Sequence, residues 1–207
     1  MSKYKLTKKS EETILDKYFK VDQATFETKT KEGKIDVMYR MKLYRPDAVA
    51  AIVFKGNDVI LVKQFRYPVA NLHPEGVVEI VAGKIDGNDA PLDSIKREIF
   101  EEIGYDVPMD SINALGSMLS SPGYSTETIF LYSVEVTDEM KTSEGGGLAD
   151  EHEDVEIIEM NKVDFWNRIS TGEINDAKTM LSAFKSSLQL DVENIEYLIY
   201  KKENPGQ

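Results

Sequence analysis

The pattern of apolar and polar positions changes along the chain and divides it into strands and helices. Residues 17–44 mix apolar–polar alternation with a break at Lys31-Glu32-Gly33, which is typical of a β-hairpin. Two strongly apolar runs within 48–65 flank Gly56-Asn57, a pair that suits a tight turn between antiparallel strands. Further strands are predicted at 76–84, 113–121, 127–137 and the second half of 143–160.

The period becomes helical after Pro91. The apolar side chains then recur at three- and four-residue steps, at Leu92, Ile95, Ile99 and Ile103. Pro91 suits the first position of a helix, and Gly104 suits the left-handed position just after its end. Two more helices are predicted at 162–170 and 176–190, and a terminal strand at 194–202. The chain is therefore expected to form a mixed α/β (α+β) domain, residues 48–207, with a small β appendage.

That appendage is the segment 1–47. It is too short to be stable alone, so its strands are expected to pack on something else. No internal repeat and no low-complexity linker separates it from the rest of the chain.

Composition narrows the possible partners. The net charge of -12 and a pI of about 4.7 predict repulsion of phosphate backbones, so no nucleic-acid partner is expected. The absence of cysteine excludes disulfides, thiolate metal sites and a cysteine nucleophile. No apolar run approaches the roughly 20 residues that span a bilayer, and the N-terminal residues lack a signal-peptide pattern. We therefore expect a soluble cytoplasmic protein without a membrane partner, which would need divalent cations to handle phosphates.

Three glutamates lie close together on the helix that follows Pro91. Glu98 and Glu102 are four residues apart and share a face, and Glu101 borders it. Like charges at this spacing repel, and carboxylate oxygens are the ligands that Mg²⁺ and Mn²⁺ prefer. From these residues alone, a solvated acidic face remains the alternative interpretation.

The longer frame resembles the Nudix box, a motif of fixed residue types at fixed offsets. Two positions depart from it: Asp89 replaces a glutamate, and Tyr105 replaces an aliphatic residue. Neither departure affects the glutamates of the motif. The matching residues are Gly83, Arg97, Glu98, Ile99, Glu101, Glu102 and Gly104.

The resemblance implies the Nudix fold, a mixed β-sheet between helices, and a catalytic site that binds Mg²⁺, with Mn²⁺ as a possible substitute. Glu98 and Glu102 would be the main metal ligands, with Glu101 and the Ala82 carbonyl as further ligands, and Arg97 would orient a glutamate. The acidic stretch 148–157 resembles a catalytic loop of the family, which nominates Glu151 as general base and Glu153 as a metal ligand. A solvated acidic loop is the alternative there, and the helix itself remains an alternative source of the base.

Other segments resemble the ADP-ribose and nucleotide-sugar pyrophosphatase branch of the family. The stretch "SSPGYSTE" from Ser120 to Glu127 carries the hallmark Pro122-Gly123, for which an ordinary turn is the alternative. The stretch "VKQFRYP" nominates Arg66 as a contact to the diphosphate. Arg40 is a weaker match to a substrate-contacting arginine, and Glu79 would line the same pocket. Each of the two has a surface salt bridge as its alternative.

The resemblance extends to "TGEINDAKTM" near the C-terminus and implies Mg²⁺-dependent hydrolysis of ADP-ribose to AMP and ribose 5-phosphate. The alternative substrate is GDP-mannose or another nucleoside diphosphate sugar. The N-terminal strands of this branch contribute to a homodimer, which we therefore expect here. A sensor that binds without hydrolysis and a hydrolase of oxidised nucleoside triphosphates are two further hypotheses.

Overall fold

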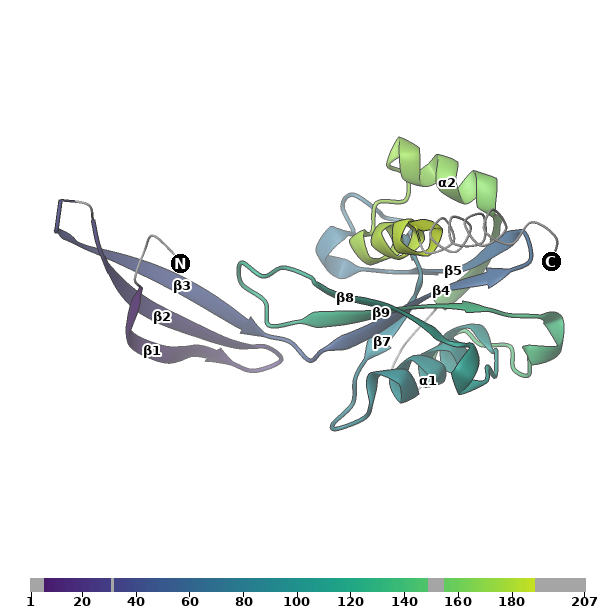
Figure 1. The fold of residues 1–207 in the computed structure, drawn as a ribbon, viewed down its shortest axis with the longest axis horizontal. Coiled ribbons are helices and arrows are strands. Elements are labelled where there is room, and N and C mark those ends of the chain that lie inside the picture. Colours follow the sequence, from purple (N-terminus) through teal and green to yellow (C-terminus); the bar gives the residue numbers. More distant parts are fainter. Residues whose placement is uncertain (1–5, 31, 149–154, 189–207) are drawn as a thin grey trace, which may run out of the picture. The chain divides into compact units, whose positions relative to one another are not determined.

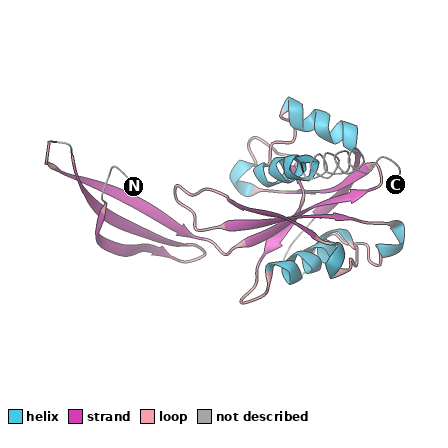
Figure 2. Ribbon diagram, viewed as in Figure 1, coloured by secondary structure: helices cyan, strands magenta, loops and turns pink. Residues whose placement is uncertain are grey.

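The computed structural model describes residues 6–30, 32–148 and 155–188. The chain forms two compact units, one made of Met1–Asp47 with Leu119–Thr128 and the other of Ala48–Met118 with Ile129–Gln207. Figure 1 labels the elements, and Figure 2 separates strands from helices by colour. The segment 119–128, assigned to the second domain from the sequence, thus packs with the N-terminal strands.

The N-terminal unit is a three-stranded antiparallel sheet of β1 (Thr7–Asp16), β2 (Lys20–Lys29) and β3 (Ile35–Tyr44), with β2 in the middle. The break expected at residues 31–33 is the turn between β2 and β3, where Gly33 has a φ of 82°. β1 was not predicted as a separate strand, because its first seven residues are all polar or charged and show no apolar alternation.

The second unit has a mixed seven-stranded sheet organised around β4 (Ala48–Lys55). One edge of β4 pairs in parallel with β9 (Thr128–Glu135). Its other edge is shared by two antiparallel partners, β7 (Val81–Lys84) along the first half and β5 (Asp58–Gln64) along the second. The remaining strands extend this sheet, with β6 (Val77–Glu79) and β10 (Val155–Asn161) pairing with β5 and β8 (Asn113–Leu119) next to β9.

Helices cover both faces of this sheet (Figure 1). Helix α1 (Pro91–Ile103) packs on one face, and α2 (Lys162–Thr171) with the helix 177–188 packs on the other. The expected mixed sheet between helices is confirmed. Among the described residues, no helix is long and apolar enough to cross a membrane.

The sheet is buried on both faces, which explains why β4 is continuously apolar. Val49, Ala51 and Val53 face α1 and its fully buried isoleucines, whereas Ala50 and Ile52 face α2. Burying one such side chain contributes about 1.5–3 kcal/mol, so this packing holds α1 firmly against the strands. The isoleucines of α1 that do so are Ile95, Ile99 and Ile103.

The strand predicted at 76–84 is divided in the structure. Residues 76–84 form two strands instead of one, because β6 pairs with β5 and β7 pairs with β4. The change of partner occurs at Ile80, whose backbone N–H donates to the Thr179 hydroxyl at 2.9 Å. The strand expected at 194–202 lies outside the described residues.

Candidate active site

The acidic face of α1 lies against β7. Glu98 and Glu102 are only 9% and 4% exposed, so the interpretation of a solvated acidic face does not hold for these two side chains. Both belong to the same face because they are one helical turn apart. Their carboxylates are placed by the same packing that buries the isoleucines of α1.

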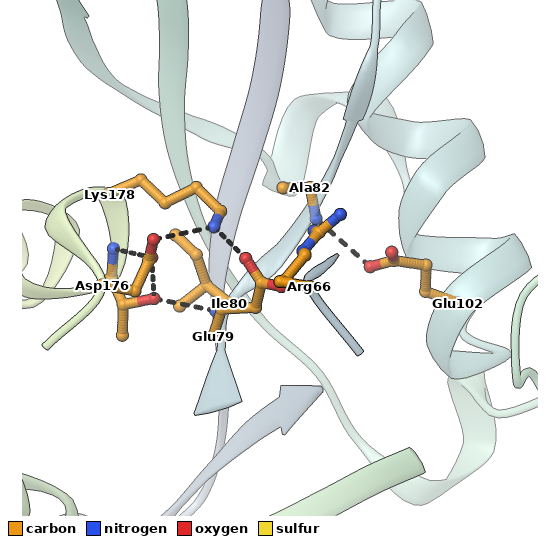
Figure 3. A network of polar contacts seen from close by, with 8 residues as sticks. Arg66, Glu79, Ile80, Ala82, Glu102, Asp176 and Lys178 are labelled. Atoms are coloured by element: carbon orange, nitrogen blue, oxygen red, sulfur yellow. Dashed lines mark hydrogen bonds and ion pairs between the residues drawn. The ribbon is translucent and has the colours of Figure 1, made fainter. Parts of the chain in front are cut away.

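Glycine at position 83 makes room for Glu98. A Cβ atom added to Gly83 would lie 1.9 Å from Cδ of Glu98 and 2.1 Å from its Oε1. Both distances are shorter than any non-bonded contact, so the strand or the Glu98 side chain would have to move. Next along β7, the Ala82 backbone N–H donates to Oε2 of Glu102 at 3.2 Å (Figure 3). The two carboxylates therefore sit directly on the backbone of residues 82 and 83.

Arg97 holds the outer side of this cluster. Its guanidinium lies 2.8 Å from the carboxylate of Asp86 and 3.5 Å from Oε1 of Glu98. Burial lowers the pKa of Arg97, but the hydrogen bond to Asp86 and the charges of Glu98 and Glu101 outweigh burial and raise it above its usual value. Asp86 was not nominated from the sequence, because it lies among the five residues between Gly83 and Asp89 whose types the motif does not specify.

Arg66 and Glu79, which the sequence nominated for the same pocket, form an ion pair. Arg66 follows β5 and donates from Nε to Oε1 of Glu79 at 2.7 Å, and Glu79 ends β6 with 3% of its surface exposed. Burial lowers the pKa of Arg66, while the charges of Glu79 and then Glu102 and Asp176 raise it, and the net pKa is above its usual value. Arg66 is therefore within electrostatic reach of Glu102 on α1.

Two further charged residues adjoin this pair and were missed. Lys178 contacts Glu79 and lies 3.0 Å from Oδ1 of Asp176 (Figure 3). The signal that would have found them is their place in "TGEINDAKTM", which was used only to extend the resemblance to the C-terminus.

The other nominated residues lie elsewhere. Arg40 belongs to the N-terminal unit, where it is exposed and donates to the Tyr39 carbonyl at 2.9 Å. Pro122-Gly123 forms a turn in the same unit, which is closed by a hydrogen bond of 3.1 Å from the Tyr124 N–H to the Ser121 carbonyl. Glu151 and Glu153 lie outside the described residues. The roles of all five stay predictions.

The residues of α1 and β7 fit a divalent cation. No three acidic or histidine side chains form a metal cluster within the described parts of the chain. The donors available there are the carboxylates of Glu98 and Glu102 with backbone oxygens, a hard-oxygen set that suits Mg²⁺ or Mn²⁺. Two carboxylates this buried on one face carry a desolvation cost and a mutual repulsion that a cation offsets.

The sequence that contains this strand and helix is matched by a family model. The model of the NUDIX domain matches residues 44–180, which is more than half of the chain. The chain belongs to the Nudix family. Nudix hydrolases generally use divalent metal ions, in agreement with the donor set on α1.

Several curated relatives of this Nudix hydrolase carry one name. A GDP-mannose pyrophosphatase of Escherichia coli O1:K1 / APEC is 32% identical over 181 residues, covering 85% of this chain and 92% of the relative. Another, from Shigella flexneri serotype 5b, is 33% identical over 173 residues, covering 81% and 87%. A solved structure described as an ADP compounds hydrolase superposes with a TM-score of 0.71 at 19% identity and covers 93% of this chain and 98% of its own, which supports the fold.

Proposed function

We propose that this Nudix hydrolase cleaves the pyrophosphate bond of a nucleoside diphosphate sugar with Mg²⁺, and that GDP-mannose is the first candidate substrate. The observation that carries the proposal is the pair of buried carboxylates on α1, held against Ala82 and Gly83. The named relatives, similar over most of the chain, favour GDP-mannose over the ADP-ribose expected first from the sequence.

In this mechanism, water attacks one phosphorus atom, the bridging P–O bond breaks, and GMP and mannose 1-phosphate leave. When bound, Mg²⁺ would supply positive charge that neutralises the diphosphate and would lower the pKa of the attacking water. Glu98 and Glu102 would hold the cation, Arg97 would restrain Glu98, and Arg66 would bind the diphosphate through its guanidinium. Glu151 remains the candidate for the general base and Glu153 for a further ligand, as the resemblance implies.

ADP-ribose is the second candidate, because the stretch from Ser120 to Glu127 resembles the branch that hydrolyses it. A panel of nucleoside diphosphate sugars with Mg²⁺, with products separated by chromatography, tests both. We expect GMP and mannose 1-phosphate to form with the highest kcat/KM. AMP and ribose 5-phosphate as the preferred products would reverse the order, and binding without any product would favour the sensor hypothesis.

Replacing Arg66 with alanine is expected to lower kcat/KM by about 10- to 100-fold, chiefly through KM. A hydrogen bond to a charged group contributes about 1.5–3 kcal/mol, which corresponds to that range. Steady-state kinetics on the preferred substrate measure the change. Arg168→Ala is the control, since Arg168 is an arginine of α2 that pairs with Glu173 at 2.8 Å, outside the site. An unchanged KM in Arg66→Ala would exclude Arg66 from the diphosphate site.

The N-terminal sheet supports a homodimer. Among its described residues, the buried ones are Ala24, Asp22 and Thr28, of which only alanine is apolar. A three-stranded sheet without an apolar core is not stable by itself. The side chains on one face of β3 are instead large, apolar and 45–63% exposed: Ile35, Val37, Tyr39 and Met41. A second copy of the chain that covers this face would bury them.

Charging this face is expected to dissociate the dimer. Val37→Lys with Tyr39→Glu places two charges in the middle of the exposed stripe of β3. Analytical ultracentrifugation should then show a dimer for the wild type and a larger share of monomer for the variant. Lys34→Glu with Asp36→Lys, on the same hairpin, is the control. A monomeric wild type would overturn the dimer proposal.

A further inference from the structure

The ion pair of Arg66 and Glu79 is part of a larger network of charged side chains (Figure 3). Lys178 contacts Oε2 of Glu79 while Arg66 contacts Oε1, so each carboxylate oxygen has its own cation. Lys178 also reaches Asp176 at 3.0 Å, and its side chain is 12% exposed. The two cations, Arg66 and Lys178, thus neutralise the two carboxylates of Glu79 and Asp176.

The start of the helix 177–188 anchors this network to the sheet. Asp176 accepts hydrogen bonds from the Thr179 backbone N–H at 2.9 Å and from its hydroxyl at 2.6 Å, which caps the helix. The same Thr179 hydroxyl accepts from the backbone N–H of Ile80, the residue between Glu79 and β7. The position of Lys178 is therefore tied to the strand segment that carries both Glu79 and Ala82.

The contacts of Lys178 determine how Arg66 can bind. A guanidinium usually grips a carboxylate with two parallel N–H groups when both oxygens are available. Here Lys178 occupies Oε2, and Arg66 binds Oε1 through Nε alone. Among the contacts of the described residues, its two terminal nitrogens make no hydrogen bond to Glu79, and 44% of its side chain is exposed.

We propose that Lys178 is a positioning residue, which occupies one oxygen of Glu79 so that Arg66 presents its terminal nitrogens to the substrate diphosphate. The proposal rests on the proposed function in that Arg66 binds the diphosphate. Without Lys178, Glu79 offers both oxygens to Arg66 and draws the guanidinium into a two-pronged pair. Lys178 acts through Arg66 and does not itself contact the substrate.

A double-mutant cycle tests this coupling. Lys178→Met is expected to lower kcat/KM about tenfold, mainly by raising KM, and to have little further effect in the Arg66→Ala background. Lys178→Arg, which keeps the charge, is expected to recover most of the loss. Lys185→Met, a lysine of the same helix outside the network, is the control. Losses that multiply in the double variant would show that Lys178 acts independently of Arg66 and would overturn the proposal.

A spectroscopic measurement tests the positioning role of Lys178 without any substrate. The Nε–H signal of Arg66 in a ¹⁵N correlation spectrum, assigned by its loss in Arg66→Ala, reports the bond to Glu79. We expect it to shift in Lys178→Met and to be retained in Lys178→Arg. Asp176→Asn, which keeps the oxygen that caps the helix but weakens the pair with Lys178, provides a second test should Lys178→Met fold poorly, with a smaller shift expected.

The two failures are distinguishable. A wild-type protein that hydrolyses none of the nucleoside diphosphate sugars, with the Arg66 signal still sensitive to Lys178, would overturn the proposed function and retain the positioning. An Arg66 signal unchanged in both Lys178→Met and Asp176→Asn would overturn the positioning, whatever the substrate is.

Discussion

Glu102→Gln is expected to lower kcat by more than about 100-fold and to leave the fold intact. Loss of a residue that merely supports a metal ligand typically costs 10–100-fold, so loss of a ligand should cost more. Glutamine has the same length and its oxygen can still accept from the Ala82 N–H, so the variant removes charge and little else. The measurement is the rate of product formation at saturating substrate and Mg²⁺, and the melting temperature of the variant checks its folding.

Glu75→Gln is the matched control for this variant, because Glu75 is an exposed glutamate outside the helix. Isothermal titration with Mn²⁺ should show weaker binding for Glu102→Gln and unchanged binding for Glu75→Gln. Near-normal turnover of Glu102→Gln would remove α1 from the proposed metal site.

Gly83→Ala is expected to reduce turnover by about 100-fold or more, although it adds a single methyl group. The new Cβ would lie 1.9 Å from Cδ of Glu98, so either the carboxylate or β7 must move. β7 is hydrogen-bonded to β4 along residues 48–51 and is anchored by the buried Val81, so the Glu98 side chain is expected to give way and leave the cation site. Steady-state kinetics measure the loss in turnover.

The cause is tested by a second substitution. In a Glu98→Ala background the added methyl group has space, so Gly83→Ala should lower the melting temperature much less there than in the wild type. Equal decreases in both backgrounds would show that the methyl group disturbs the strand and not Glu98.

Local signals explain what could be predicted from the sequence. The helical period after Pro91 predicted α1 with both of its ends, because Pro91 and the left-handed Gly104, with φ of 78°, bound it by backbone chemistry alone. The spacing of Gly83 to Gly104 identified the family, since one strand and one helix that pack together require fixed offsets between their residues. The structure adds the reason for the glycine, which is the contact with Glu98.

Local sequence signals could not predict the contacts between segments that are far apart in the chain. The sequence nominated Arg66 and Glu79 for one pocket but did not predict that they touch. The structure joins them because β5 and β6 are paired. Lys178, 99 residues after Glu79, reaches the same carboxylate through the helix 177–188. Likewise, the segment 119–128 joins the N-terminal unit through a hydrogen bond that the Leu43 N–H donates to the Tyr124 carbonyl.

The sequence by itself determined the family, the elements around β4 and α1, and the glutamates of the candidate metal site. The elements follow from periodicity, and the family and the role of the glutamates follow from the resemblance of a short stretch of chain to a known motif. Only the tertiary structure decided which of the charged residues are buried together, because burial and ion pairing depend on how the sheet and the C-terminal helix pack. The network of Arg66, Glu79 and Lys178 is the product of that packing.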